Sequence, residues 1–294
     1  KVMKVIEDIV TKSVNKALSN RRPAGGYFGT RKYKDFPPSF VDLITESEGL
    51  VDITAGTGQF PYALALNGTP VIVNDRCYYV SRLLKGAFLY KARSEKEVGD
   101  YTRQVAYALL PERVSPVKGW LFNNHRRLKD GRSCFSDETA EYIDGVCCAL
   151  REIPKPLRVV LEYALGKSLL RWTFRSRQWT EYGTNGRLLA GNSPKIVHEW
   201  IIQEAAKLWA LSLRIKDSKT SASYGEAVDL FRKKEVGGML VHADPAWPYA
   251  KKSGGANPYN FFTTTISSII KQELVQVESW EKEWPPEKIM QIVN

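Results

Sequence analysis

Hydrophobic residues recur along the chain with two kinds of pattern, one helical and one extended. Within residues 1–18 the apolar side chains follow the three- and four-residue spacing of one helix face: Val2, Ile6, Ile9, Val10 and Val14. This spacing predicts an amphipathic helix. Two short, almost wholly apolar runs at 50–54 and 70–74 predict buried strands. Helical patterns are found at 39–45, 59–66 and 78–92.

The first hundred residues therefore predict the beginning of an α/β fold. A strand, a glycine-bearing turn at 55–58, a helix and a second strand follow one another, and the second strand ends at Asp75. This order is typical of the first half of a nucleotide-binding α/β unit.

The middle of the chain has a different character. Helical patterns dominate from about 96 to 222, and a helix at 224–234 and an apolar strand at 238–243 follow. A strand–helix unit takes about 30 residues, so the roughly 190 residues from the first strand to Asp244 exceed what two or three units need. The sequence therefore predicts an α/β domain formed by residues 1–95 and 223–294, with a mainly helical domain inserted over 96–222.

Composition and charge narrow the class of protein. The 294 residues are 43% hydrophobic and 26% charged, as in globular proteins. No apolar run approaches the roughly 20 residues that a membrane span needs. The four cysteines form no C-x-x-C pair, which predicts reduced thiols in a cytoplasmic protein. The net charge of +11 favours a polyanionic partner, above all nucleic acid, over a basic enzyme that acts on small molecules.

A first candidate site surrounds the predicted glycine turn. Asp52 lies within the first predicted strand, and Asp75 ends the next strand about 20 residues later; between them lie Ala55, Gly56, Thr57, Gly58 and Gln59. Glycines let the backbone approach a ligand, and the second acid can hold ribose hydroxyls. Because only one G-x-G is present, a nucleoside without phosphates fits better than a dinucleotide. An ordinary strand–turn–helix remains the alternative.

A second candidate site follows the last predicted strand, in which His242 is expected to pack. The segment Asp244-Pro245-Ala246-Trp247 offers a carboxylate, rigid backbone carbonyls and an aromatic face. Together these groups suit a flat base with an exocyclic amine, whose hydrogens the acid and a carbonyl accept. A proline-rich turn with a core tryptophan is the alternative. A third segment, the loop Gly26–Lys32, has glycines beside aromatic and cationic residues, which suit a carboxylate-bearing ligand; by itself an ordinary surface loop is favoured.

These three segments together resemble the D12, or Dam-like, class of DNA adenine-N6 methyltransferases, which use S-adenosylmethionine. The family's Y-x-G-S-K segment is similar to Tyr27-Phe28-Gly29-Thr30-Arg31, its F-x-G-x-G loop to Thr54–Gly58, and its D-P-P-Y motif to Asp244–Trp247. Thr30, Arg31 and Ala246 depart from the family's residues. The order of segments is also the family's. The resemblance implies a Rossmann-like methyltransferase sheet with an inserted target-recognition domain, and restriction–modification or phage defence as the context.

The resemblance also implies roles for individual residues. Residues 27–31 would hold the methionine end of S-adenosylmethionine, residues 52 and 55–59 its body, Asp75 its ribose and Glu226 its adenine. Asp244, with the carbonyl of Pro245, would bind the N6 amine of an extruded adenine, and Trp247 would stack on that base. The implied activity needs no metal, and the three scattered histidines predict no metal site.

A DNA-contacting segment is predicted in the inserted domain. Residues 169–179 interleave aromatic rings with Arg171, Arg175 and Arg177, a combination that binds phosphates and unpaired bases. The turn signal Asn185-Gly186, followed by Arg187, resembles the family's asparagine–glycine loop, which enters the DNA. A solvated basic face is the alternative.

The residues after the catalytic motif are too few for the family's remaining strands, since 50 residues follow Asp244. Either a second polypeptide completes the sheet or the sequence belongs to a longer chain. Two functions follow from the sequence: a methyltransferase acting on double-stranded DNA, or a noncatalytic nucleic-acid-binding subunit with a degenerate methyltransferase fold.

Overall fold

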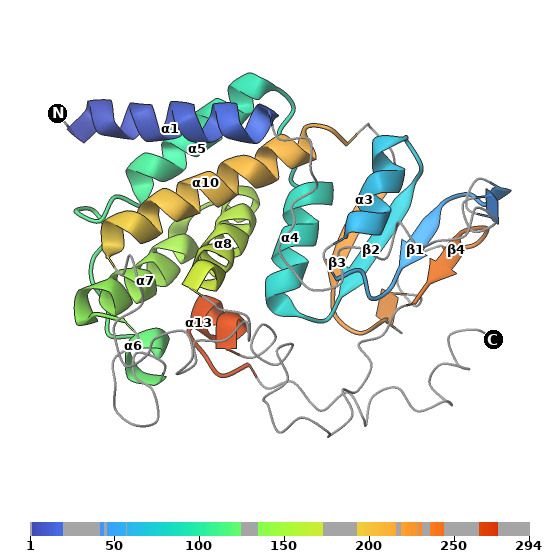
Figure 1. The fold of residues 1–294 in the computed structure, drawn as a ribbon. Helices are drawn as coiled ribbons and strands as arrows, with labels where there is room; N and C mark the ends of the chain where they lie inside the picture. The colour runs from blue at the N-terminus through green and yellow to red at the C-terminus, as the bar shows by residue number, and fades with distance from the viewer. Residues whose placement is uncertain are drawn as a thin grey trace.

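The fold is that of a computed structural model, which describes residues 2–19, 42–43, 46–56, 58–124, 135–172, 193–215, 219–227, 229–230, 236–243 and 265–275. Figure 1 shows a helical half beside a half built around a sheet. No helix within these ranges is both long and apolar enough to cross a membrane.

The sheet has four parallel strands in the described part of the chain. They are β1 (Leu50–Asp52), β2 (Val71–Asp75), β3 (Thr220–Tyr224) and β4 (Leu240–His242), in the spatial order β3-β2-β1-β4. Asp52 pairs in register with Val73 on β2 and with His242 on β4. The predicted α/β class is confirmed, and the all-parallel sheet is compatible with a Rossmann-like fold.

Apolar side chains alternate between the two faces of the sheet and pack into a separate hydrophobic cluster on each face. Leu50, Val71 and Val73 point into the main hydrophobic core, together with α3 (Gln59–Leu66) and α4 (Tyr78–Phe88). Val51, Ile53 and Ile72 pack on the opposite face with two residues that follow β3, Ala227 and Leu230. Strands β1 and β2 are thus buried on both faces, as central parallel strands require, whereas β4 is only partly buried.

The helical half is formed by α1 (Val2–Ser19), α5 (Glu95–Ala108), α6 (Trp120–Asn124), α7 (Asp137–Ala149), α8 (Lys155–Leu169), α10 (Pro194–Ser212) and α13 (Ser267–Lys271), with 3-10 turns at Leu150–Glu152 and Leu170–Trp172. Ser94, Ser136 and Ser193 cap α5, α7 and α10, each accepting a backbone N–H of the first turn. The core of these helices is continuous with that of α4 and β1. The insertion predicted over 96–222 thus shares its core with the sheet half, and the division into domains stays a prediction.

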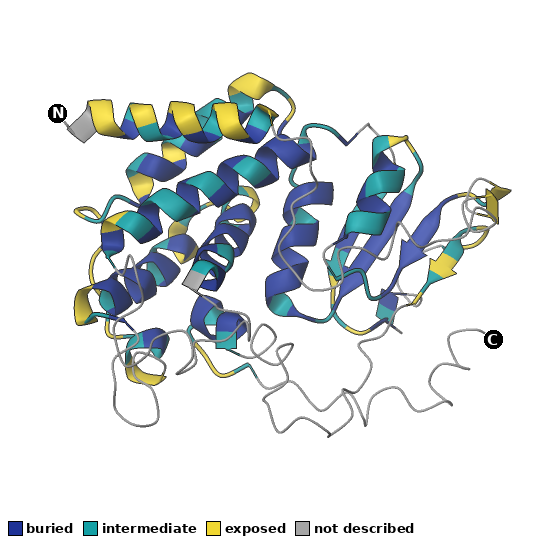
Figure 2. Ribbon diagram, viewed as in Figure 1, coloured by how far each residue is buried: buried dark blue, intermediate teal, exposed yellow. Residues whose placement is uncertain are grey.

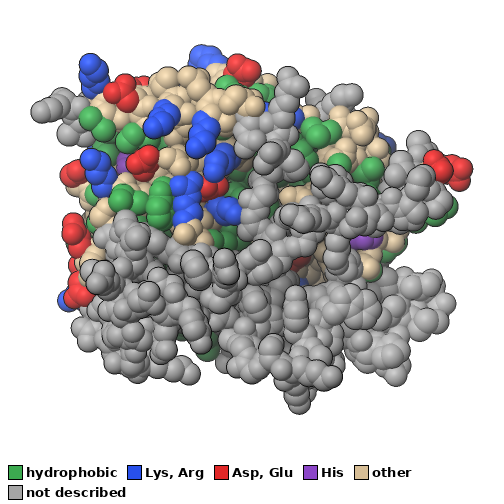
Figure 3. Space-filling model, in the orientation of Figure 1, with side chains coloured by type: hydrophobic (Ala, Val, Ile, Leu, Met, Phe, Trp, Pro, Cys, Tyr) green, Lys and Arg blue, Asp and Glu red, His purple; other side chains and the backbone are tan. Residues whose placement is uncertain are grey.

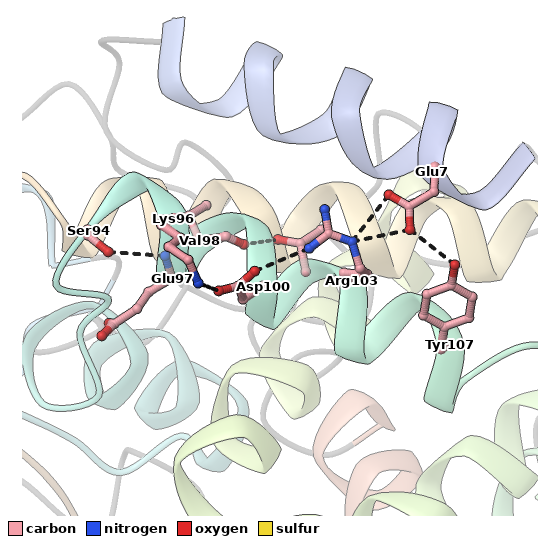
Figure 4. Close-up of polar contacts among 9 residues, drawn as sticks. Glu7, Ser94, Lys96, Glu97, Val98, Asp100, Arg103 and Tyr107 are labelled. Atoms are coloured by element: carbon pink, nitrogen blue, oxygen red, sulfur yellow. Dashed lines mark hydrogen bonds and ion pairs between the residues drawn. The ribbon is translucent and has the colours of Figure 1, made fainter. Parts of the chain in front are cut away.

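Helix α1 confirms the N-terminal prediction and lies along the outside of the helical half. Its Ile6 and Val10 pack against Ala106 of α5 and Ile202 of α10, while its outer face is exposed (Figure 2). Figure 4 shows that Glu7 also accepts hydrogen bonds from Arg103 and Tyr107 of α5. On α5 itself, Ser94 caps the first turn and Lys96 pairs with Asp100. Helix α1 thus packs on α5 and α10 through one apolar stripe, and a partly exposed polar contact adds to its attachment to α5.

Several elements differ from their predicted limits, among them β2, predicted at 70–74, and β4, predicted at 238–243. Strand β1 ends at Asp52, and residues 53–54 already turn; α4 ends at Phe88 rather than at 92. Strand β3 was not predicted, because its sequence Thr-Ser-Ala-Ser-Tyr lacks an apolar run. Of the helix predicted at 224–234, the described residues begin their helical turn only at Ala227, since 220–224 is a strand. Residues 42–43 are helical within the segment predicted at 39–45.

Candidate functional site

The candidate site lies where β1 and β4 end side by side. In the order β3-β2-β1-β4 the chain winds outward in both directions from the gap between β1 and β4. Ligands of open α/β sheets bind outside the carboxyl ends of the strands at such a switch point. The described residues at this edge include Asp52, the glycine turn, Asp75, His242 and Glu226.

The glycine turn has a backbone that only glycine adopts easily. Gly56 has φ of 52° and Gly58 of 66°, both in the left-handed region. A Cβ on Gly58 would lie 2.7 Å from Leu84 Cδ2, so helix α3 begins in close contact with α4. A Cβ on Gly56 would meet no atom of the described residues within 4 Å. Of the two glycines, Gly58 therefore serves close packing, whereas the described residues leave open space beside Gly56.

Asp75 ties this turn to the end of β2. Its Oδ2 accepts the Gly56 N–H at 3.0 Å, and its Oδ1 accepts the Cys77 N–H at 2.7 Å. Burial raises the pKa of this carboxyl from 3.8 to about 7, although both hydrogen bonds act in the opposite direction. Both oxygens thus have partners within the chain. A ribose at this position would have to use their remaining lone pairs or replace the Gly56 N–H.

A buried acid and a histidine join the two central strands. His242 Nδ1 lies 3.3 Å from Asp52 Oδ1, and the Thr54 N–H donates to the same oxygen at 3.3 Å. The ring of Phe60, from α3, contacts the imidazole edge-on with centroids 5.4 Å apart. The His242 side chain thus lies between Asp52 and the Phe60 ring, two residues before Asp244. No local pattern predicted this pair, since 190 residues separate its members.

Asn74 is a second residue that sequence reasoning missed. The buried Asn74 amide donates to the Gly225 carbonyl at 2.9 Å and accepts the Ser223 hydroxyl at 2.8 Å. These bonds fix the end of β3 against β2. Just beyond them, Arg76 lies 3.6 Å from Glu226, which places Glu226 at the same edge as the glycine turn. In the sequence, the position of Asn74 directly before Asp75 was the signal that could have indicated a structural role for its amide.

The structure brings together six of the predicted cofactor residues besides Glu226: Asp52, Ala55, Gly56, Gly58, Gln59 and Asp75. In the described part of the chain the buried Gln59 Oε1 has no hydrogen-bond partner, so this acceptor is available at the start of α3. The other predicted site residues lie outside the described residues: Tyr27, Phe28, Gly29, Thr30, Arg31, Thr57, Asp244, Pro245, Ala246, Trp247, Arg175, Arg177, Asn185, Gly186 and Arg187.

Arg171, predicted to contact DNA, is already engaged within the helical half. Its guanidinium pairs with the buried Glu204 of α10, donates to Gln203 at 3.0 Å and lies over the Trp200 ring at 5.1 Å. Lys207 pairs with the same carboxylate at 2.9 Å. Figure 3 shows Lys and Arg side chains gathered over this half of the molecule. The positive charge of Arg171 is therefore already paired within the chain, without a nucleic acid. Its contact with DNA stays a prediction.

The polar groups at this edge are mainly acceptors. They are the buried carboxylates of Asp52 and Asp75, the amide oxygen of Gln59 and the partly exposed backbone at Gly56, which are chemically suited to hydroxyl and amine groups. Among the residues that the structure describes, no three histidine, cysteine or acidic side chains are grouped as a metal site would require. Comparison of the chain with protein-family models, with curated proteins and with solved structures finds no match.

Proposed function

We propose that the protein is a DNA adenine-N6 methyltransferase that uses S-adenosylmethionine. The observation that carries the proposal is the juxtaposition at the switch point. The glycine turn after β1 is clasped to the acid that ends β2, and the adjacent strand β4 ends two residues before Asp244. By the motif resemblance, the glycine turn and Asp75 would bind the cofactor, and the segment after β4 would bind the target amine.

The described residues fit the cofactor at the turn and in part at Asp75. Among the described residues, no atom lies within 4 Å of a Cβ on Gly56 and Gln59 Oε1 has no hydrogen-bond partner; both features suit a nucleoside at this turn. Glu226, at the end of β3, is within reach of the same edge through its contact with Arg76. Asp75 fits less simply, because it must share its oxygens between two backbone N–H groups and a ribose.

The chain's own groups would hold and orient the target base. S-adenosylmethionine supplies an electrophilic methyl group. Asp244 and the Pro245 carbonyl accept the hydrogens of the N6 amine and leave its lone pair directed away from the base. Trp247 stacks on the extruded adenine and offsets part of the few kcal/mol that unstacking costs. Alignment of the amine accounts for the acceleration, as in other transfer reactions that depend on positioning.

The decisive experiment measures transfer of labelled methyl groups from S-adenosylmethionine into mixed-sequence double-stranded DNA. We expect label in N6-methyladenine, and its loss in Asp244→Ala with retained cofactor binding. Gly99→Ala is the control substitution away from the sheet, because it lies on α5 and its Cβ would meet no described atom within 4 Å. Failure of the wild-type protein to bind S-adenosylmethionine would contradict the proposal.

One observation favours the alternative of an enzyme completed by a second polypeptide. In the described sheet β4 pairs on one side only, with β1, and its Val241 is 40% exposed. A parallel strand is normally buried on both sides. If the chain binds the cofactor but transfers no methyl group, addition of a partner that restores transfer would establish this form of the function. A noncatalytic subunit would stay inactive under both conditions.

A further inference from the structure

Six cations gather where α4 packs against α8, and all of them except the buried Arg82 are partly or fully exposed. They are Arg82 and Lys85 of α4, Arg151, Lys155 and Arg158 at and before the start of α8, and Lys271 of α13. We call this set the α4–α8 basic surface. The Arg158 guanidinium donates to the Arg151 carbonyl at 3.5 Å, and Arg151 donates to the Lys271 carbonyl at 3.2 Å. Figure 1 shows α4 and α8 side by side, with α13 at their end.

Carboxylates neutralise only part of this surface. Glu162 lies at its centre, 3.3 Å from Arg82 and 3.9 Å from Arg158, and it accepts the Tyr78 hydroxyl at 3.2 Å. Glu273 pairs with Lys271 at 2.5 Å, and Glu152 neighbours Arg151 in the chain. Six cations thus face three acids. Arg151 and Lys155 are exposed and make no ion pair that would occupy them among the described residues.

Burial and the neighbouring positive charges both lower the pKa of Lys85. Burial, together with Arg82 and Lys155, lowers the pKa of Lys85 from 10.5 to about 8, and Glu162 offsets this only in part. Beside it, the first turn of α8 contains no acidic residue, so the positive end of the helix dipole adds to the field. Such an arrangement is favourable when an anion lies on it.

The basic surface borders the candidate site. Tyr78, the first residue of α4, lies beneath Arg82 at 4.2 Å and within 5.5 Å of Lys271. The same ring contacts Tyr224 at the carboxyl end of β3, with centroids 5.6 Å apart. From there α4 extends over 11 residues, about 16 Å at 1.5 Å per residue. That length matches several phosphates of one DNA strand, spaced about 3.4 Å along the duplex axis.

We infer that the α4–α8 basic surface binds the sugar–phosphate backbone of double-stranded DNA next to the carboxyl edge of the sheet. The inference rests on the proposed function for the identity of the polyanion. It assigns the backbone contacts to residues that local sequence patterns did not single out. Phosphate contacts of this kind position a duplex without reading its sequence, so recognition of bases is left to other residues.

The test compares two triple variants that remove the same charge. Arg151→Gln, Lys85→Gln and Lys155→Gln together neutralise the basic surface. Lys4→Gln, Lys12→Gln and Lys16→Gln together neutralise exposed lysines of α1. Binding of fluorescein-labelled, mixed-sequence duplex DNA is followed by anisotropy at several salt concentrations, with circular dichroism to confirm folding. Each lost phosphate contact lowers the slope of log K against log salt by about 0.9, so we expect a decrease of about 2.7 in the first variant.

Affinity of the first variant should fall by about tenfold or more at physiological salt, and the α1 variant should bind like the wild type. Equal slopes in the two variants would overturn the inference. So would a first variant that loses binding to vesicles of anionic phospholipid while its binding to DNA is unchanged. Failure of the proposed function is separate, because it appears as absent methyl transfer by a wild-type protein that still binds DNA through this surface.

Discussion

The pH dependence of stability tests the environment of Asp75. This carboxyl is 5% exposed and accepts two backbone N–H groups, and burial raises its pKa to about 7. In the unfolded chain the pKa returns to its ordinary 3.8. Between these two values the folded protein binds a proton that the unfolded chain has released. The free energy of unfolding contributed by Asp75 is therefore greatest at low pH and falls as pH rises towards 7.

The size of the effect follows from linkage. One pKa unit corresponds to 1.36 kcal/mol, so the shift corresponds to about 4 kcal/mol when the window is crossed completely. Between pH 5 and pH 8, only part of the window is crossed, and the expected decrease in the free energy of unfolding is about 2.5 kcal/mol. Other groups, such as the buried His198, whose pKa burial lowers, also contribute to the pH profile of the protein.

Comparison with Asp75→Asn removes those other contributions. Asparagine keeps the size of the side chain but does not titrate; it retains one acceptor for two N–H groups, which gives a constant offset. Urea unfolding of both proteins at pH 5 and pH 8 gives the difference directly. We expect the wild type to lose about 2.5 kcal/mol more than the variant between the two pH values. Parallel profiles would refute the account, because they would mean that the carboxyl titrates alike in both states.

Three further outcomes follow from the same contacts. If the ionised Asp75 holds the ribose, affinity for S-adenosylmethionine measured by calorimetry should rise about tenfold between pH 6 and pH 8, and the rise should vanish in Asp75→Asn. Gly58→Ala should lower the free energy of unfolding by about 2 kcal/mol through its positive φ and its clash, whereas Gly99→Ala in α5 should raise it by about 0.5–1 kcal/mol; urea titrations that rank the two alike would contradict this. Arg171→Gln should cost about 1–3 kcal/mol of stability by weakening the pairing of the buried Glu204, with DNA affinity unchanged by anisotropy; a selective loss of DNA binding would restore its predicted role.

The elements that the sequence predicted well are those whose burial follows a simple period. Strands β1 and β2 are buried along their whole length, so each appears as an apolar run. Helix α3 was predicted to the residue, because a glycine in a left-handed turn begins it and a glycine follows it. In these segments the local hydrophobic pattern agrees with the burial in the fold, so the pattern alone was sufficient to predict the element.

Strand β3 could not be predicted in the same way. Of its residues only Ala222 is buried, and Ser223 has a polar partner on the neighbouring strand. It pairs with β2 over five residues, and just beyond its end the Asn74 amide donates to Gly225 across 151 positions of sequence. A polar strand at the end of the described sheet is stabilised by hydrogen bonds to its neighbour, and hydrophobic periodicity does not detect such bonds.

Arg171 shows the same limitation for function. Its interleaving with aromatic residues was a local signal for nucleic acid, yet its charge is balanced by Glu204, 33 residues away on α10. The α4–α8 basic surface has the opposite origin: its cations are spread from position 82 to position 271, and only packing brings them together. A sequence shows net charge and local runs, but the sites where charge stays unbalanced depend on which carboxylates the fold places beside each cation. The net charge of +11 therefore favours a polyanionic class of partner but does not indicate which surface would bind it.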